Sequence, residues 1–403
     1  MADIAILGAG MVGITTALAL QERGHACVVI DRARPGRETS YGNAGIIQAE
    51  AMEPYALPSN PFDMLALALG RKNAVSLHWT ALKQAPALAA YWRTSLPGRL
   101  ATVIPLWADL VREAVPRHAA LVAAAGADDL IRRDGYWEAH GTDAGLAAAL
   151  GEAERRRRHY GLDFTLMDRG ALARAEPSLS RSLAGAIHWT APWTCRAPGE
   201  LVGAYARLFE QRGGRVVIGE ARSLRQAGAG WEVAGESAER VVVALGPWAP
   251  DLLAPLGYRV PMVRKRGYHR HYAGAHGLSR PMLLVDHSVV LSPMRQGLRI
   301  ATAAELSAAA PKDDPRQLAR GEAAARGLLD LGAPVEATPW SGTRPCLPGM
   351  LPLVCPAPRH PGLWFHFGHG HQGFTLGPVT AARLARAMDG DIAAVAGLDR
   401  SVT

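Results

Sequence analysis

Cysteine and lysine are both scarce in this sequence of 403 residues. The four cysteines form no CxxC pair and follow no regular spacing, which excludes a disulfide framework and a zinc ribbon. Lysine supplies only four of the 44 basic residues, so the net charge of +8 is carried by arginines spread along the chain. A nucleic-acid-binding protein more often concentrates its positive charge beside aromatic residues, so no nucleic-acid partner is expected.

Long apolar runs are also missing. No segment reaches the ~18 uninterrupted apolar residues that a membrane-spanning helix needs, and the N-terminus lacks the basic region of a signal peptide. We therefore expect a soluble cytoplasmic protein, and we leave open peripheral contact with the inner face of a membrane and assembly into a homo-oligomer. At ~150 residues per domain the length predicts two or three globular domains. The arginine run 155–158 lies in a helical pattern and is expected to form a solvated helix face.

The N-terminal 31 residues read as a strand, a glycine turn, a helix and a second strand. Short apolar runs at 4–7 and 27–30 predict strands buried on both faces, and residues 14–23 predict the helix between them. The turn at 8–13 has the sequence GAGMVG, and the second strand ends at Asp31. This order is typical of a dinucleotide-binding unit, although a glycine-rich turn in another α/β unit is the alternative.

Each part of this unit has a physical role in holding a dinucleotide. Gly8 allows the tight turn, Gly10 lets the backbone approach a pyrophosphate, and Gly13 lets the helix pack closely on the strand. The N-terminus of the helix offers free N–H groups to the phosphates. Asp31 can accept hydrogen bonds from a ribose, and because Arg32 follows it without replacing it, NAD or FAD is favoured over NADP.

One further segment favours FAD, and a second fits the close approach of a backbone to a cofactor. Residues 39–47 form a loop of small and polar residues that a nicotinamide enzyme does not need at this place. The predicted strand at 241–245 runs into Gly246-Pro247-Trp248, which suits a backbone that approaches a cofactor, although on its own this motif also fits an ordinary strand and turn.

The C-terminal region repeats the pattern of strand, glycine loop and helix. The strand is predicted at 364–367, the loop at 368–377 and the helix at about 379–388. His366, His369 and His371 suggest a metal site, but no nearby Cys, Asp or Glu completes a ligand shell, so no metal is expected.

These motifs, in this order along nearly the whole chain, resemble those of the bacterial FAD-dependent D-amino-acid dehydrogenases. That family lies within the wider superfamily of D-amino-acid oxidase, glycine oxidase and sarcosine oxidase. The resemblance implies an α/β fold, with a Rossmann-like FAD-binding domain and an interleaved α+β substrate domain built on an antiparallel sheet. The FAD domain is expected from segments 1–52, 142–255 and 338–403, and the substrate domain from 53–141 and 256–337. The residues expected to bind FAD are Gly8, Ala9, Gly10, Met11, Val12, Gly13, Asp31, Arg32, Thr39, Ser40, Asn43, Ala44, Gly45, Ile46, Ala244, Gly246, Trp248, Gly342, Gly370, Gln372, Gly373, Phe374 and Thr375.

The resemblance also implies a substrate site. Arg344, in the motif Gly342-Thr343-Arg344-Pro345, matches the arginine that holds the substrate carboxylate in related oxidases, and a guanidinium can grip a carboxylate with two hydrogen bonds. A structural ion pair is the alternative role. The carbonyl of Gly342 is expected to point at the substrate amine. After a predicted strand at 260–263, Tyr268 or His269 can face the flavin but not both, because neighbours on a strand face opposite sides; we favour Tyr268.

The implied chemistry is oxidation of an amine carbon. Arg344 and Tyr268 are the expected catalytic residues: hydride passes from the substrate Cα to flavin N5, and the imine is hydrolysed to a 2-oxo acid and ammonia. Backbone N–H groups of the loop at 372–375, where the N-terminus of the following helix points, are expected to stabilise charge on the flavin. Gly342 aligns with the position at which sarcosine oxidases attach their flavin to a cysteine, so the FAD is expected to be non-covalent. The alternative substrates are a secondary or cyclic amino acid (D-hydroxyproline, D-proline or sarcosine) and a 2-hydroxy acid. The chain is alternatively the flavin subunit of a heteromeric dehydrogenase. The expected electron acceptor is a quinone, an electron-transfer protein or oxygen.

Overall fold

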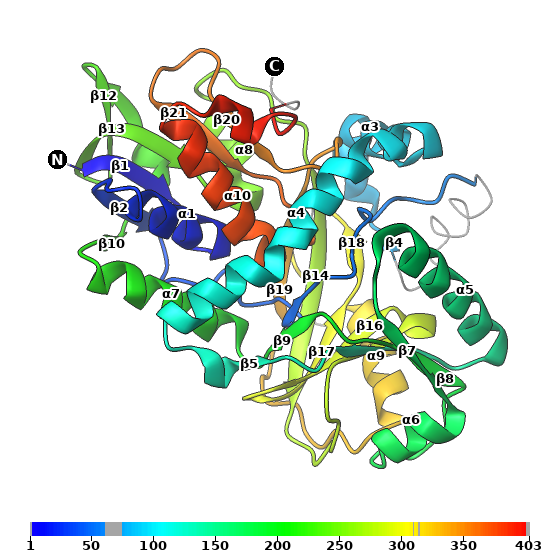
Figure 1. The fold of residues 1–403 in the computed structure, drawn as a ribbon. Coiled ribbons are helices and arrows are strands. Elements are labelled where there is room, and N and C mark those ends of the chain that lie inside the picture. Colours follow the sequence, from blue (N-terminus) through cyan, green and yellow to red (C-terminus); the bar gives the residue numbers. More distant parts are fainter. Residues whose placement is uncertain (1, 61–74, 309, 313–314, 400–403) are drawn as a thin grey trace.

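The computed structural model describes residues 2–60, 75–308, 310–312 and 315–399, which form two large sheets and the helices packed on them (Figure 1). The parts of the predicted segments that fall on 1, 61–74, 309, 313–314 and 400–403 lie outside the described residues.

The first sheet has eight strands in the order β10-β2-β1-β13-β12-β11, with β21 paired to β13 and β20 paired to β21. The five strands β10, β2, β1, β13 and β21 are parallel, as expected for a Rossmann-like unit, while β11, β12 and β20 are antiparallel additions. The strands are β1 Ala2–Leu7, β2 Cys27–Asp31, β10 Arg215–Ile218, β11 Arg225–Ala227, β12 Gly230–Val233, β13 Glu236–Val243, β20 Leu353–Pro356 and β21 Leu363–Phe367.

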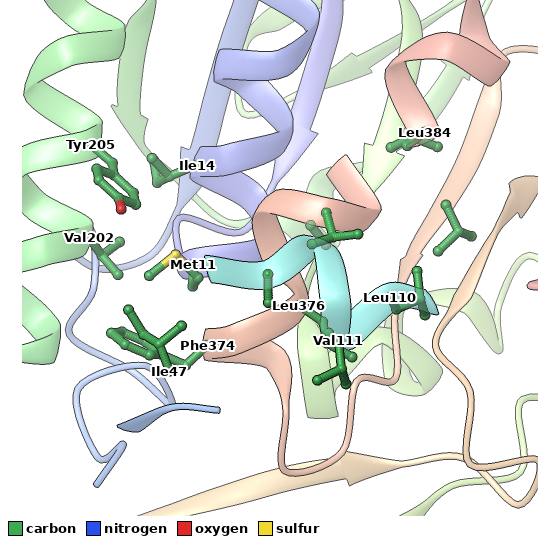
Figure 2. Packing of buried hydrophobic residues seen from close by; sticks show 14 of the residues in the cluster. Met11, Ile14, Ile47, Leu110, Val111, Val202, Tyr205, Phe374, Leu376 and Leu384 are labelled. Carbon is green, nitrogen blue, oxygen red and sulfur yellow. The ribbon is translucent and has the colours of Figure 1, made fainter. Parts of the chain in front are cut away.

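Helices from distant parts of the chain cover one face of this sheet. They are α1 Met11–Gln21, α7 Pro198–Gln211 and α10 Gly373–Met388, and α4 Pro97–Ala124 packs on α10 and α7. The helices α1 and α10, from opposite ends of the chain, pack side by side (Figure 1). In Figure 2, Met11 and Ile14 of α1 lie beside Val202 and Tyr205 of α7, with Phe374 of α10 close by. Burial of this apolar layer holds the N-terminal ends of α1 and α10 at the same edge of the sheet.

The other face is covered differently from a doubly wound sheet. There α8 (Ala249–Leu253) and the hairpin β11–β12 pack on the parallel strands, and Trp231, Tyr258 and Phe365 are buried among them. No crossover helix is needed on this face, because antiparallel strands can be joined by short turns.

The second sheet has ten strands in the order β4-β18-β14-β17-β16-β15-β6-β8-β7, with β19 paired to β14. Its pairs are antiparallel except β15–β6 and β18–β4, so the predicted antiparallel substrate sheet is present. The strands are β4 Val75–Leu77, β6 Tyr136–His140, β7 Phe164–Asp168, β8 Gly185–Trp189, β14 Val263–Tyr272, β15 Met282–Leu284, β16 Val289–Met294, β17 Gly297–Thr302, β18 Ala304–Leu306 and β19 Trp340–Cys346.

Smaller elements connect the two sheets. Three short strands form a third sheet: β3 Ile46–Ile47, β5 Ile131–Arg132 and β9 Trp193–Cys195. The other α-helices are α3 Ala85–Ser95, α5 Asp143–Tyr160, α6 Arg169–Ala175 and α9 Arg316–Arg326. The 3₁₀ turns are η1 Trp79–Gln84, η2 Asp128–Leu130, η3 Ala221–Ser223, η4 Gly246–Trp248, η5 Val285–His287 and η6 Ile392–Val395.

The fold class predicted from the sequence is confirmed, but sheet membership departs from the predicted segments at two places. The strands β7 and β8 lie within segment 142–255, which was assigned to the FAD domain, yet they pair with β6 of the ten-stranded sheet. Similarly β19, within segment 338–403, pairs with β14. The division into domains stays a prediction, and the pairing explains why local pattern misses it: partners far apart in sequence select the sheet.

Three local predictions need correction. The strand predicted at 260–263 begins at Val263, where pairing with Cys346 starts. The helix predicted from about residue 379 begins at Gly373. Pro378 lies within this helix and has no N–H to donate to the carbonyl oxygen of Phe374. That oxygen accepts a hydrogen bond from His118 Nε2 at 2.9 Å instead, which is why the proline is tolerated. The arginine run is only partly solvated, since Arg155 pairs with Glu53 and Glu152.

Candidate active site

A cavity of about 610 Å³ runs from the C-terminal edge of the parallel strands to the ten-stranded sheet. Most of the residues expected to bind FAD line it, and these are Gly8, Gly10, Met11, Val12, Asp31, Arg32, Thr39, Ser40, Asn43, Ala44, Ile46, Ala244, Gly246, Trp248, Gly342, Gly370, Gly373 and Phe374. Five are not among the lining residues, namely Ala9, Gly13, Gly45, Gln372 and Thr375. Arg344 and Tyr268 line the cavity and His269 does not.

The glycine turn brings the first helix unusually close to the strands. Gly8 has φ +110°, and a Cβ on it would lie 2.6 Å from the carbonyl oxygen of Ala244. A Cβ on Gly13 would lie 1.7 Å from the carbonyl oxygen of Gly8. Neither position admits a side chain, so the N-terminus of α1 reaches the cavity edge as a phosphate-binding turn requires.

Polar groups at this turn match the two ends of an adenosine diphosphate. The first turn of α1 contains no acidic residue, and Ser40 Oγ accepts from the N–H of Met11 at 2.9 Å. The carboxylate of Asp31 accepts from the N–H of Ala9 at 2.6 Å and from that of Ala33 at 2.9 Å, which fixes its orientation at the end of β2. Spare lone pairs on Asp31 can still accept from ribose hydroxyl groups.

A cation and an indole frame the same end of the cavity. The guanidinium of Arg32 lies 4.5 Å from the ring centroid of Trp248, and both residues line the cavity. Such a stacked pair presents a flat surface suited to an aromatic base.

The small-residue loop 39–45 is tied to the ten-stranded sheet. Arg299 of β17 donates to the carbonyl oxygens of Tyr41 at 2.8 Å and Asn43 at 2.5 Å. Ser292 of β16 donates to the carbonyl oxygen of Ala44 at 2.8 Å. Burial lowers the pKa of Arg299 to about 10, which leaves the guanidinium charged at neutral pH. The loop therefore has a fixed position against the substrate side of the cavity.

The C-terminal loop places a helix N-terminus at the cavity. Gly373 and Phe374, in the first turn of α10, line it, and the first N–H groups of a helix have no intrahelical acceptor.

Two histidines of this C-terminal region are bonded to threonine hydroxyl groups. His366 bonds Thr16 Oγ1 at 2.7 Å and Thr380 Oγ1 at 2.8 Å, and His369 also bonds Thr380 Oγ1 at 2.8 Å. These histidines thus have hydroxyl partners, and no group of three or more possible metal ligands was found among the described residues.

The end of the cavity at the ten-stranded sheet, where the substrate is expected, has a floor made by β14 and β19. In the antiparallel register Gly267 opposes Gly342 and Lys265 opposes Arg344. Neither glycine leaves an open space, because a Cβ on Gly342 would lie 2.1 Å from the indole of Trp340 and a Cβ on Gly267 would lie 2.7 Å from one guanidinium nitrogen of Arg344. The guanidinium of Arg344 therefore lies directly over the backbone of Gly267.

Arg344 is held without being neutralised. Its two terminal nitrogens donate to the carbonyl oxygens of Ala303 at 2.6 Å and Thr302 at 3.1 Å. Among the residues that the structure describes, no carboxylate forms an ion pair with it, so the alternative role as a structural ion-pair partner finds no support there. Burial lowers the pKa of Arg344, but a guanidinium stays protonated at neutral pH. A carboxylate from outside the chain is the natural counter-ion.

Tyr268 and His269 point to opposite faces of β14. The hydroxyl of Tyr268 donates to Glu305 Oε1 at 3.1 Å, and Arg266 on the same face pairs with Glu305 at 3.4 Å. His269 stacks on Trp340 with 4.8 Å between ring centroids, on the face that carries Gly267. Tyr268 borders the cavity, but its side chain lies on the face opposite Gly267 and Arg344 with its hydroxyl bonded to Glu305, and its expected contact with a substrate carboxylate stays a prediction.

Sequence reasoning missed several residues on the substrate side. Gln48 accepts from Gln372 Nε2 at 2.5 Å, and Tyr55 lies 5.1 Å from His371 between ring centroids. Lys265 lines the cavity from β14. None belongs to a local motif; only the pairing of β14 with β19 and the path of the chain after β3 bring them together.

The residues present fit an FAD. A glycine cradle that excludes side chains, a carboxylate at the end of β2 and two helix N-termini surround one elongated cavity. Residues 3–387 match the family model described as FAD dependent oxidoreductase. The chain belongs to this family. It is therefore an FAD-dependent oxidoreductase, and the predicted cofactor is confirmed.

Curated relatives and solved structures agree with this assignment. The chain is 28% identical to a D-amino-acid oxidase of Bradyrhizobium diazoefficiens, over 96% of this chain and 95% of the relative. It is 30% identical to a D-amino acid dehydrogenase of Cereibacter sphaeroides, over 96% of this chain and 92% of the relative. The fold is similar to that of iminodiacetate oxidase from Chelativorans, with TM-score 0.69, 20% identity and coverage of 96% and 95% of the two chains.

No helix among the described residues is long and apolar enough to cross a membrane.

Proposed function

We propose that this oxidoreductase oxidises D-amino acids to 2-oxo acids and ammonia, with Arg344 as the anchor of the substrate carboxylate. The observation that carries the proposal is the position of Arg344, a charged guanidinium that lines the cavity over Gly267 and, among the described residues, bonds two backbone carbonyl groups and no carboxylate. Both curated relatives reported above are named for D-amino acids, which supports this substrate class.

The cofactor is held by the glycine turn, Asp31, loop 39–45 and the first turn of α10. When bound, FAD would supply the acceptor for the hydride of the substrate Cα, and water would hydrolyse the resulting imine. The helix N-terminus at Gly373 offers N–H groups to negative charge that develops on the ring.

The chain's own residues orient the substrate and set its charge. Arg344 can grip a carboxylate with the N–H groups that Ala303 and Thr302 leave free, which fixes the position of the substrate Cα beside the β14–β19 pair. His371 lines the same cavity, and its burial, with Arg344 and Lys265 nearby, holds its pKa well below the usual value. A neutral imidazole and two cations at the site favour the uncharged amine, the form from which hydride can leave.

Anaerobic reduction of the bound flavin tests the proposal. The holoenzyme is mixed with matched D- and L-amino acids, D-proline, hydroxyprolines, sarcosine and 2-hydroxy acids, and the loss of flavin absorbance near ~450 nm is followed. Faster reduction by D- than by L-enantiomers supports it, while reduction only by secondary amines or hydroxy acids contradicts it. Oxygen or a quinone added to the reduced enzyme then identifies the acceptor by the return of absorbance.

Replacement of the anchor provides the matched variant. Arg344→Met should keep FAD and fold but raise KM by roughly 30- to several-thousand-fold, since losing a buried charge-assisted pair costs ~2–5 kcal/mol. Arg344→Lys should restore part of the loss, because lysine carries the charge without the two-pronged geometry. Unchanged kcat/KM in Arg344→Met would place the carboxylate elsewhere.

A further inference from the structure

A second cation lies beside Arg344, and the oxidation proposed above does not need it. Lys265 is only 4% exposed, lines the same cavity and directly opposes Arg344 in the β14–β19 pair. Directly opposed residues of an antiparallel pair have Cα atoms about 4.5–5.5 Å apart and side chains on one face of the sheet. Two positive side chains therefore rise from neighbouring points of the cavity floor.

Lys265 has an aromatic contact but no anionic partner. Its Nζ lies 4.0 Å from the ring centroid of Tyr91, a residue of α3. Within the described part of the chain, no carboxylate forms an ion pair with Lys265 and no acceptor bonds its ammonium group. The acid nearest in the pairing scheme, Glu305, opposes Arg266 and bonds Arg266 and Tyr268 on the other face of β14. Burial and the neighbouring Arg344 lower the pKa of Lys265, because an ammonium without a counter-ion is costly at this site, and an anion bound beside it would favour the charged form.

The two cations are held in different directions. Arg344 leans along β14 toward Gly267, where Ala303 and Thr302 hold its guanidinium. Lys265 instead reaches toward Tyr91 on α3. Because the side chains diverge from one cross-strand pair, they suit two separate anionic groups better than the two oxygens of a single carboxylate.

We propose that Lys265 binds a second anionic group of the substrate, so that the enzyme prefers D-amino acids with an acidic side chain, D-aspartate and D-glutamate. This inference rests on the proposed function for the role of Arg344 and adds the substrate class. The α-carboxylate lies on Arg344 and the side-chain carboxylate lies on Lys265 beside Tyr91. A neutral side chain of the same shape leaves the buried ammonium unpaired, and that difference sets the specificity.

Equilibrium binding of unreactive acids to the holoenzyme tests the inference. The probes are succinate and glutarate, compared with butyrate and valerate of equal chain length, and the readout is the perturbation of the flavin spectrum. The diacids should bind the natural enzyme at least ~30-fold more tightly, the lower end of the loss for an unpaired buried charge. In Lys265→Met this preference should vanish while the monoacid affinities change less than about threefold, and Lys265→Arg should restore part of it.

Controls separate this inference from the proposed function. Lys83→Met removes an exposed lysine of η1 and should leave the diacid preference intact. Flavin content and thermal unfolding show whether Lys265→Met folds. Equal affinity for diacids and monoacids in the natural enzyme, or a preference that survives in Lys265→Met, overturns the inference. Equal weakening of all four acids in that variant also overturns it, because Lys265 then binds the same carboxylate as Arg344. If diacids are preferred but no D-amino acid reduces the flavin, the proposed function fails. The assignment of Lys265 as the binding residue for a second anionic group then still holds, but for another class of substrate.

Discussion

Substitution of Gly267 by alanine probes the carboxylate anchor without touching its charge. A Cβ at this position would lie 2.7 Å and 2.8 Å from the two terminal nitrogens of Arg344 and 2.9 Å from its central carbon. Contact between such atoms is comfortable at about 3.5 Å, so the guanidinium has to move by about 0.8 Å. The movement strains or breaks the bonds to Ala303 and Thr302, because these fix the guanidinium where the new methyl group would be.

The fold should tolerate this change better than the site does. The clash involves the far end of a flexible side chain, and alanine is favoured over glycine in a strand by about 0.5–1 kcal/mol. Losing one of the two bonds costs about 1.5–3 kcal/mol because the donor is charged, so after the gain from alanine the free energy of unfolding should fall by about 0.5–2.5 kcal/mol. A displacement near 1 Å costs up to about a hundredfold in a positioned contact, and we expect monocarboxylate affinity to fall between tenfold and a hundredfold.

Titration of the holoenzyme with butyrate measures the effect. Gly151→Ala is the control, since nothing lies within 4 Å of a Cβ built on this glycine of α5, and it should leave the affinity unchanged. Gly267→Ala should have no further effect when Arg344 is already methionine, because both changes act on one contact. An unchanged dissociation constant in Gly267→Ala, with FAD bound, would refute the placement of the anchor over residue 267.

The other predictions concern the cofactor and the helix that supports it. Acid precipitation of the holoenzyme should release a yellow supernatant, and flavin that stays with the pellet would show a covalent bond. Asp31→Ala should weaken FAD binding by about 1.5–3 kcal/mol, as expected for a charged hydrogen bond, and full flavin content after extended dialysis would contradict the ribose contact. Burial lowers the pKa of His118 to about 4, so the unfolded chain gains a proton there near pH 6.5 that the folded chain does not accept until pH 4. Stability should therefore fall by up to about 3 kcal/mol as the pH drops through this window, and urea unfolding should show a flatter pH profile in His118→Gln but not in the exposed control His159→Gln.

Local pattern is sufficient to predict the arrangement of the glycine turn and of the acid that follows it. The turn from Gly8 to Gly13 and the acid at Asp31 lie within one strand–helix–strand unit, so their arrangement follows from neighbouring residues alone. The buried strands at β2 and β21 were predicted for the same reason, since continuous apolar runs suit strands covered on both faces.

The substrate half depends on pairing between distant strands. Gly267 and Gly342 are 75 positions apart, and the need for glycine at 267 is visible only once the register brings Arg344 over it. Lys265 looks like one basic residue in a basic segment until that same register places it opposite Arg344. The early start of α10 was missed because Pro378 normally marks a helix boundary, and the side chain that compensates for it, His118, belongs to α4.

The bonds from Arg299 to the carbonyl oxygens of Tyr41 and Asn43 have a mechanical consequence. They join a loop at the parallel sheet to the middle of the antiparallel sheet, and Ser292 adds a third bond on the neighbouring strand. The two sheets therefore cannot move apart unless the buried hydrogen bonds of the charged Arg299 break first. Ligands are therefore expected to enter while these three hydrogen bonds stay intact. Loss of the three bonds would weaken the binding of cofactor and substrate together.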